Sequence, residues 1–172
     1  METRDIELML MRTWPAIEER TYDGWVLRFS RGYTKRSNCI NPLYESYFDL
    51  EEKFEYCRKI YKEKRLPIIY KLIDTKVSLM VDEFLEKKGL KKQDMVTVKE
   101  IDLTDVDYNL KSISINWGFS KEWYDFYTAE NNLNTEEKDI LKKLLEKNDK
   151  NNVYVYKSIN NEIIAVAMGS VE

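Results

Sequence analysis

The chain of 172 residues is 43% hydrophobic and 34% charged, a balance typical of one ordinary globular domain or two small ones rather than of a disordered chain. It contains no histidine, which excludes Ser-His-Asp and Cys-His nucleophile systems and all His-ligated metal sites. Its net charge of −3 gives no general attraction to nucleic acids or anionic membranes. No stretch approaches the roughly 20 apolar residues of a membrane span, and the N-terminus lacks the pattern of a secretory signal. We therefore predict a cytoplasmic protein without nucleic-acid, membrane or metal partners.

The first predicted elements form a hairpin. After an N-terminal segment compatible with a helix, residues 24–30 have the aromatic and β-branched content of a strand, entered through a turn at Asp23. Residues 36–41 follow as a second strand, which ends at Pro42 because proline has no N–H to donate to a ladder. We expect the two strands to pair through a turn around Gly32.

Two amphipathic helices come next. Asp49 is the expected N-cap of the first, and Glu52 stands three residues on, as a capping box requires. The second is expected to end at Gly89, which can adopt the left-handed conformation of a helix C-terminus. Apolar residues recur at helical spacing in both: Leu50, Phe54, Cys57 and Tyr61 in the first, and Met80, Val81, Phe84 and Leu85 in the second. The two cysteines, Cys39 and Cys57, are interpreted as small core residues.

Two further strands are predicted in this part of the chain. Residues 66–73 are a short, apolar, β-branched run typical of a buried strand, and residues 95–101 alternate as a half-buried strand does. The first hundred residues therefore spell β-β-α-β-α-β. Lys and Arg exceed Asp and Glu there by 20 to 18, whereas from residue 101 onward they are outnumbered by 8 to 13. This change in charge indicates a boundary between domains 1–104 and 105–172.

The second domain is predicted to begin with two helices. Ser120 is the expected cap of the first helix, and Asn134 with Glu137 forms the capping pair of the second. Apolar residues at helical spacing define the faces that these helices bury: Trp123, Phe126, Tyr127, Ile140, Leu141, Leu144 and Leu145.

A hairpin is expected after these helices. Its strands, 153–158 and 163–168, turn at Asn160 and Asn161, because asparagine tolerates the positive φ of a two-residue turn. The second domain thus spells α-α-β-β, and the fold class is α/β (α+β), a mixed sheet flanked by helices. The last strand presents an apolar edge, and a second copy of the chain is a candidate partner for it in a homodimer.

Five short strings carry a family resemblance. Together with the α-α-β-β order, they resemble bacterial members of the GCN5-related N-acetyltransferase (GNAT) superfamily that have an acetyltransferase-like half domain before the catalytic one. The resemblance covers essentially the whole chain, but the sequence departs from it at Cys39, where the family has serine. The strings are 12–16 (RTWPA), 23–28 (DGWVLR), 32–34 (GYT), 36–38 (RSN) and 41–43 (NPL).

The resemblance implies acetyl-CoA as co-substrate and a small-molecule or peptide amine as acceptor. It also implies a loop of the type [RQ]-x-x-G-x-[GA], whose backbone N–H groups hold the pyrophosphate at a helix N-terminus. Nothing after Ala165 provides that loop. We therefore interpret the chain as an incomplete and inactive form of a longer enzyme, whose cofactor-binding residues lie outside this sequence.

Direct transfer of the acetyl group, as the resemblance implies, needs a carboxylate or a water to accept a proton from the amine. Glu172 is the candidate for this catalytic role, because the resemblance places it near the entry to the central strand. Glu130 is a second acidic candidate. A solvated surface charge is the alternative interpretation of Glu172.

Basic and polar residues across the first hairpin are candidates for substrate binding. Basic side chains there could gather a phosphate or a carboxylate, although a solvated hairpin face explains them as well. Polar side chains on apolar strands could hydrogen-bond a substrate, but capping or cross-strand pairing is an equal alternative. The candidates are Arg28, Thr34, Arg36 and Asn38, with Arg31 and Lys35 in the same cluster.

Two other functions stay open at this stage. One is a non-catalytic acetyltransferase-like module that binds a small molecule or a protein, and the other is a dimerisation unit built through the last strand. The four tryptophans and twelve tyrosines are interpreted as core or domain-interface residues, because a nucleic-acid stacking platform needs basic surroundings that they lack.

Overall fold

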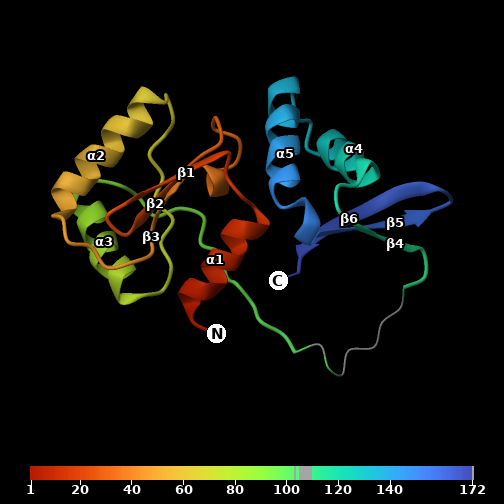
Figure 1. Ribbon diagram of the computed structural model, residues 1–172, viewed down its shortest axis with the longest axis horizontal. Helices are drawn as coiled ribbons and strands as arrows, with labels where there is room; N and C mark the ends of the chain where they lie inside the picture. The colour runs from red at the N-terminus through yellow and green to blue at the C-terminus, as the bar shows by residue number, and fades with distance from the viewer. Residues whose placement is uncertain (103, 105–109, 172) are drawn as a thin grey trace.

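A computed structural model of the protein describes residues 1–102, 104 and 110–171. Their strands form two three-stranded antiparallel sheets, one early and one late in the chain, and helices pack against both (Figure 1). This arrangement confirms the predicted α+β class. No helix among the described residues is long and apolar enough to cross a membrane.

The first sheet has the order β1-β2-β3 and consists of β1 (Glu18–Tyr22), β2 (Trp25–Phe29) and β3 (Ile40–Pro42). β1 was not predicted, because most of its residues are exposed and it lacks apolar alternation. Asp23 and Gly24 connect it to β2 with φ values of 41° and 78°, which glycine adopts easily. The turn predicted at this point is therefore the loop of a β1–β2 hairpin.

The predicted strand 36–41 is only partly correct. Its first half is a 3₁₀ turn, Lys35–Ser37, and only its last two residues belong to β3. The reason is local, because the side chain of Asn38 bonds to four backbone groups of residues 30–34 and holds them in a compact loop. These backbone groups are then not available to a strand ladder.

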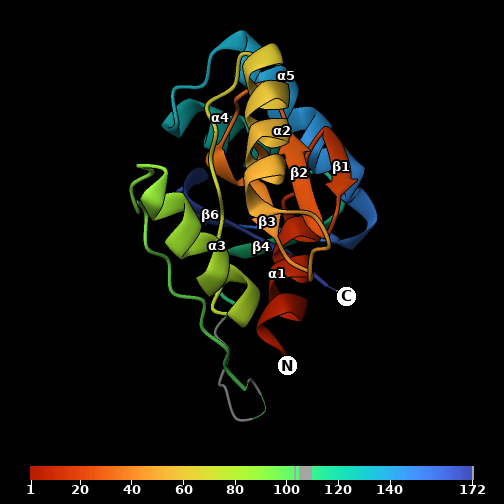
Figure 2. The same cartoon turned by 90° about the vertical axis from the view of Figure 1, so that its left-hand side faces the viewer.

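The helices of this unit agree with the predicted ones. Asp49 caps α2, but its carboxylate accepts from the backbone N–H of Glu51 at 2.8 Å, so the capping box expected with Glu52 does not form. Gly89 follows α3 with φ 81°, as predicted. Figure 2 shows α2 in front of the first sheet, beside β2, and its buried residues pack against that sheet. The bounds are α1 (Thr3–Thr13), α2 (Leu50–Glu63) and α3 (Lys76–Lys87).

Two predicted strands are corrected by the structure. Within residues 66–73, Tyr70 forms a single parallel bridge with Ile40, through hydrogen bonds of Ile40 with the flanking residues. Residues 95–101 form no strand, and the side chains of Met95 and Ile101 are 91% and 74% exposed. An alternating pattern becomes a strand only when another strand supplies the ladder, and none of the described strands lies beside this segment.

The second unit has the predicted two helices and hairpin, preceded by a strand that was not predicted. The capping box of Asn134 and Glu137 is present, and Ser120 accepts from the N–H of Trp123 at 3.2 Å. Asn160 and Asn161 have φ values of 51° and 67°, which confirms the predicted turn. The bounds are β4 (Ile113–Trp117), α4 (Lys121–Glu130), α5 (Thr135–Lys147), β5 (Asn152–Ile159) and β6 (Glu162–Ser170).

Each sheet has its own hydrophobic core. Trp25, Leu27 and Ile40 of the first sheet are buried against α2 and α3, together with Cys57. The second core lies between α4, α5 and the β4-β5-β6 sheet. It also takes in aromatic and apolar residues from early in the chain: Trp14, Ile17 and Tyr33.

Candidate functional site

The predicted substrate-binding residues lie together on one short segment. Arg28 is on β2, and Thr34, Arg36 and Asn38 belong to the loop that leads to β3. This loop has positive φ values at three positions: Arg31, Gly32 and Thr34. Non-glycine residues keep a positive φ only when the surrounding structure holds them in it, so the side chains that bond to this loop determine its conformation.

Arg28 is the centre of the segment, with only 2% of its surface exposed. Its Nε donates to Glu19 at 2.9 Å, and its Nη1 donates to the carbonyl of Arg36 at 2.7 Å. Its Nη2 donates to the carbonyls of Met11 and Trp14 at 3.0 and 2.6 Å. Four of the five N–H groups of the guanidinium therefore have a partner within the protein. Arg28 braces the end of α1 against β1 and the 3₁₀ turn.

Asn38 is similarly engaged. Its Oδ1 accepts from the backbone N–H groups of Ser30 and Gly32 at 2.7 and 2.9 Å, and its Nδ2 donates to the carbonyls of Tyr33 and Thr34, both at 2.8 Å. The amide is buried and uses both its acceptor and its donors. It fixes the loop rather than facing solvent.

The other candidates differ in exposure. Thr34 Oγ1 accepts from Trp14 Nε1 at 3.1 Å and is hydrogen-bonded to Ser37 at 2.9 Å. Arg36 is exposed, and Lys35 forms an ion pair with Asp94. The structure thus brings the four predicted residues together, but it leaves Arg36 as the one among them with an exposed side chain. Substrate binding by this cluster stays a prediction.

The outer side of the same loop contacts the second unit. Tyr33 packs in the core of α4, α5 and the second sheet, and burial together with the neighbouring Tyr127 raises its pKa. Lys147 at the end of α5 donates to the carbonyls of Ala16 and Ile17, both at 2.7 Å. A hollow of about 260 Å³ lies at this contact between the end of α1 and Lys147. Tyr33 of this loop and the segment just before β1 therefore couple the two units.

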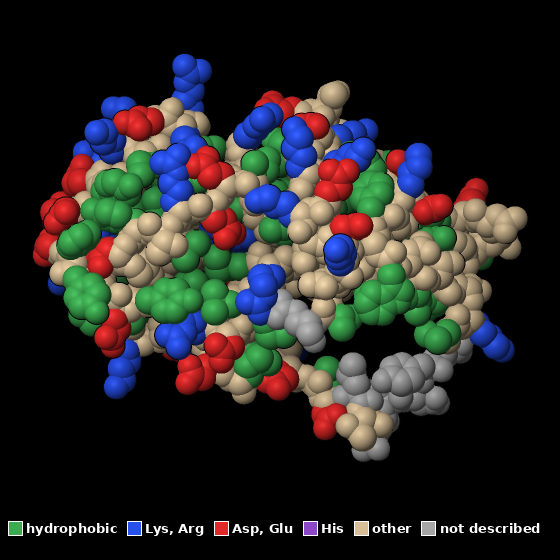
Figure 3. All heavy atoms as spheres, viewed as in Figure 1, with side chains coloured by type: hydrophobic (Ala, Val, Ile, Leu, Met, Phe, Trp, Pro, Cys, Tyr) green, Lys and Arg blue, Asp and Glu red, His purple; other side chains and the backbone are tan. Residues whose placement is uncertain are grey.

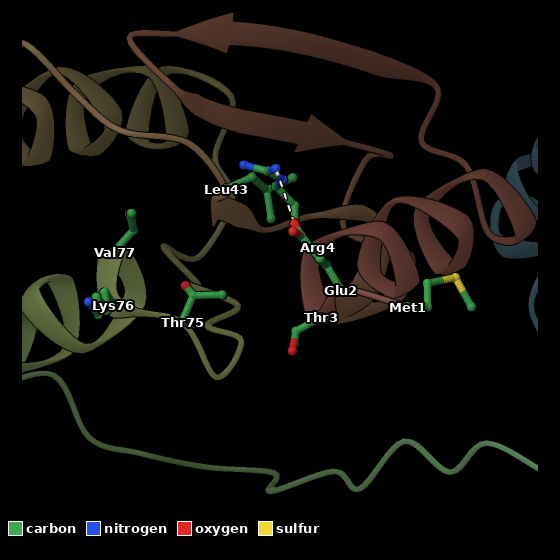
Figure 4. A pocket seen from close by; sticks show the side chains of 8 residues that line it. All are labelled: Met1, Glu2, Thr3, Arg4, Leu43, Thr75, Lys76 and Val77. Carbon is green, nitrogen blue, oxygen red and sulfur yellow. Dashed lines mark ion pairs between the residues drawn. The ribbon is translucent and has the colours of Figure 1, made fainter.

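A larger hollow of about 420 Å³ opens where the N-terminal ends of α1 and α3 approach one another (Figure 4). Arg4 lies in it but is ion-paired with Glu2 at 3.5 Å. Thr75 lies at its other side and caps α3 by accepting from the N–H of Ser78 at 3.3 Å. The charged group of Arg4 is thus neutralised within the protein, and no glycine lines the hollow.

Sequence reasoning missed a buried ion pair. Lys53 of α2 is fully buried, and its Nζ lies 3.2 Å from Asp23 Oδ2 and 2.6 Å from Ser46 Oγ. Burial lowers the pKa of Lys53, although Asp23 opposes that shift. Burial would raise the pKa of Asp23, but its hydrogen bonds and Lys53 together hold that pKa well below its usual value. One feature of the sequence does indicate that Lys53 is buried: it stands three residues after Leu50 and so lies on the apolar side of its helix.

The C-terminal strand has an open edge. Val171 N donates to Asn151 O at 2.9 Å, so this pair is a hydrogen-bonded one in the antiparallel β5–β6 ladder. Because the pattern alternates, the backbone groups of Val166, Met168 and Ser170 point away from β5. In the described part of the chain β5 is the one neighbour of β6 in the sheet.

The predicted catalytic residue, Glu172, lies outside the described residues. Glu130 is exposed at the last position of α4, with no cleft lined by it among the two hollows above. A catalytic role for either carboxylate stays a prediction.

The described residues do not fit the pyrophosphate of acetyl-CoA. The nearest equivalent of a glycine followed by a helix is Gly118, which precedes α4. Its neighbouring amide, Phe119 N, already donates to the carboxylate of Asp149, and Ser120 occupies the N–H of Trp123. A carboxylate at this helix N-terminus would repel a phosphate. The segment is therefore closed to such a ligand.

The fold and this geometry define an α+β protein with two coupled sheet units, and the comparison with protein families places it further. Residues 1–170 match the family described as "Probable histone acetyltransferase Rv0428c C-terminal". Since the match covers nearly all of the 172 residues, the chain belongs to this acetyltransferase family. No curated protein and no solved structure matched the chain.

Proposed function

We propose for this chain the function of a GNAT-type N-acetyltransferase, which transfers the acetyl group of acetyl-CoA to an amine by direct attack. The observation that carries the proposal is the match of residues 1–170 to an acetyltransferase family. The order of the second unit supports it, because α4 and α5 are followed by the β5–β6 hairpin, as in the resemblance described above. The extra strand β4 completes an antiparallel sheet beneath these two helices.

The proposal assigns no cofactor contact to the described residues, since none of them fits the pyrophosphate. We therefore expect residues 1–172 alone to be inactive. Calorimetric titration of acetyl-CoA into the purified chain tests this point. No heat of binding is expected at millimolar cofactor, and a dissociation constant in the micromolar range would contradict the fit described above.

The activity itself is best tested on protein isolated from the cells that encode it, through an affinity tag at Met1. This protein is incubated with acetyl-CoA and a panel of amines that includes small amines, polyamines and peptides. Release of the free thiol and mass spectrometry of the amines are followed together. An acetylated amine is the expected product, and a panel with no acetylated member would refute the proposal. Glu172→Gln in the same protein tests the proposed catalytic carboxylate.

A dimerisation unit is a second candidate function, supported by the edge of β6. Three residues direct backbone N–H and C=O groups outward, and residues 163–170 contain no charged side chain that would protect such an edge. An antiparallel second copy would continue the sheet through these groups. Met168→Pro removes an outward N–H, whereas Met168→Ala keeps it. If β6 joins two copies, light scattering will show a dimer that the first variant alone abolishes.

A further inference from the structure

Exposed aromatic side chains gather where the loop between β3 and α2 meets the β1–β2 hairpin. Tyr47 is 97% exposed and Phe48 49% exposed. The ring of Tyr22 lies 5.8 Å from that of Phe48 and stacks on Tyr56, with 3.8 Å between the ring centroids. Tyr22, Tyr47, Phe48 and Tyr56, together with Glu52, are called the aromatic-acidic surface below.

The backbone under this surface is held firmly. The carboxylate of Asp23 accepts from the N–H groups of Tyr47 and Phe48 at 3.0 and 2.9 Å and from the hydroxyl of Ser46. Lys53 neutralises that carboxylate from the buried side. A large aromatic ring presented on a fixed backbone loses little conformational entropy when a partner covers it. Tyr47 therefore has the properties of a binding anchor rather than of a core residue.

Two carboxylates near these rings have no ion-pair partner among the described residues. Glu51 and Glu55 on α2 are paired with Lys88 and Arg58, but Glu45 and Glu52 form no ion pair within the described chain. Glu52 stands one helical turn before Tyr56 on α2, and Tyr56 stacks on Tyr22. Burial and then the charge of Glu52 raise the pKa of Tyr22, in agreement with this placement. In Figure 3, hydrophobic side chains on the part of the surface formed by α2 and α3 lie among both acidic and basic ones.

A cation already occupies one ring of the same loop. The guanidinium of Arg4 lies over Tyr44, 5.2 Å from the ring centroid, at the point where the loop leaves β3. The face of an aromatic ring attracts cations because of its quadrupole, and a nearby carboxylate adds Coulomb attraction. The rings of Tyr47 and Phe48 offer the same chemistry, but the cations of the described residues lie over other rings.

We propose that the aromatic-acidic surface binds a lysine- or arginine-rich peptide segment of a partner protein. The rings take the cationic side chains on their faces, and Glu52 supplies the complementary charge. Nucleic acids and anionic membranes are disfavoured at this surface by the same carboxylates. The inference goes beyond acetyl transfer, because it concerns binding and holds with or without that activity.

The test is fluorescence anisotropy of a labelled ten-residue peptide of alternating lysine and serine, titrated with the 172-residue chain without acetyl-CoA. A peptide of alternating glutamate and serine is the charge control. We expect binding of the basic peptide alone, weaker by about tenfold in Tyr47→Ala. Glu52→Gln should weaken it less and reduce its dependence on salt.

Trp117→Ala is the matched control, because Trp117 is an aromatic residue of the other unit with 66% exposure. Its affinity for the basic peptide should equal that of the wild type. Thermal unfolding of each variant verifies that the fold is kept, and Phe48→Ala provides a second variant of the surface. Equal binding of the two peptides, or equal effects of Tyr47→Ala and Trp117→Ala, would overturn the inference. Acetyl transfer is absent from this assay, so its outcome leaves the proposed function untouched.

Discussion

Replacing Arg28 by methionine should destabilise the first unit strongly. The change removes four hydrogen bonds and leaves the carbonyl of Met11 without a partner in a buried place. Hydrogen bonds to charged groups contribute about 1.5–3 kcal/mol each, but water can replace the partner of Glu19 and of the two less buried carbonyls. We therefore expect a loss of about 3–5 kcal/mol, a large share of the roughly 5–15 kcal/mol that stabilises an ordinary protein.

Arg28→Lys should recover part of this loss. Its ammonium keeps the charge, but one nitrogen cannot reach four acceptors that the guanidinium contacts through three nitrogens. A loss of about 2 kcal/mol is expected.

Urea unfolding followed by tryptophan fluorescence and circular dichroism measures these changes. Arg36→Met is the matched control, because the Arg36 side chain is exposed and its removal should cost less than about 0.5 kcal/mol. If Arg28→Met costs no more than this control, Arg28 is not a brace. In that case its sequence-based interpretation as a substrate-binding residue becomes the better one.

Three more predictions concern other parts of the molecule. The folded-state pKa of Asp23 lies below the unfolded value of about 3.9, so its stabilising effect is complete above about pH 5 and is lost as the pH falls through the folded pKa. Between pH 5 and pH 3, the unfolding free energy of Asp23→Asn should therefore fall by less than that of the wild type. Urea unfolding at the two pH values measures both decreases, and equal decreases would contradict this prediction. Lys147→Met removes two hydrogen bonds between the units and should lower the unfolding free energy by about 1–2 kcal/mol in the same assay. Lys143→Met is its control, because it breaks only an exposed i,i+4 ion pair and should lower the unfolding free energy by less than about 0.5 kcal/mol. Gly24→Ala would place a Cβ against the backbone oxygen of Glu45 and should lower the unfolding free energy by more than about 2 kcal/mol. Gly89→Ala has the same sign of φ but open space around the new Cβ, so it should lower the unfolding free energy by only about 1 kcal/mol. Similar losses at the two glycines would show that the close approach at Gly24 is relieved elsewhere.

The candidate site shows the limit of sequence-based interpretation most clearly. The sequence grouped the polar residues of the β2–β3 segment correctly, because they lie within eleven positions of one another. It could not show that the guanidinium of Arg28 and the amide of Asn38 are used up inside the protein. The acceptors of Arg28 include Trp14, fourteen residues earlier, and nothing in the local pattern indicates such a contact.

Strands were harder to predict than helices for a related reason. β1 is largely exposed and carries no apolar alternation, so it exists because β2 pairs with it. β4 alternates apolar and polar residues over five positions and pairs with β5, but so short a run was not recognised as a strand. Residues 95–101 alternate well and yet form no strand. The buried pair of Lys53 and Asp23 was missed because its members are thirty residues apart.

The sequence by itself determined the features whose interactions are local. Ser120 and Asn134 cap their helices, and the two asparagines at 160 and 161 turn the last hairpin, because the groups that stabilise each of them lie within a few residues. The tertiary structure alone decided which strands pair, which charges are buried and which rings stay exposed. Those outcomes depend on partners that only folding brings within a few ångströms, and the free energy of such contacts has no counterpart in a short window of sequence.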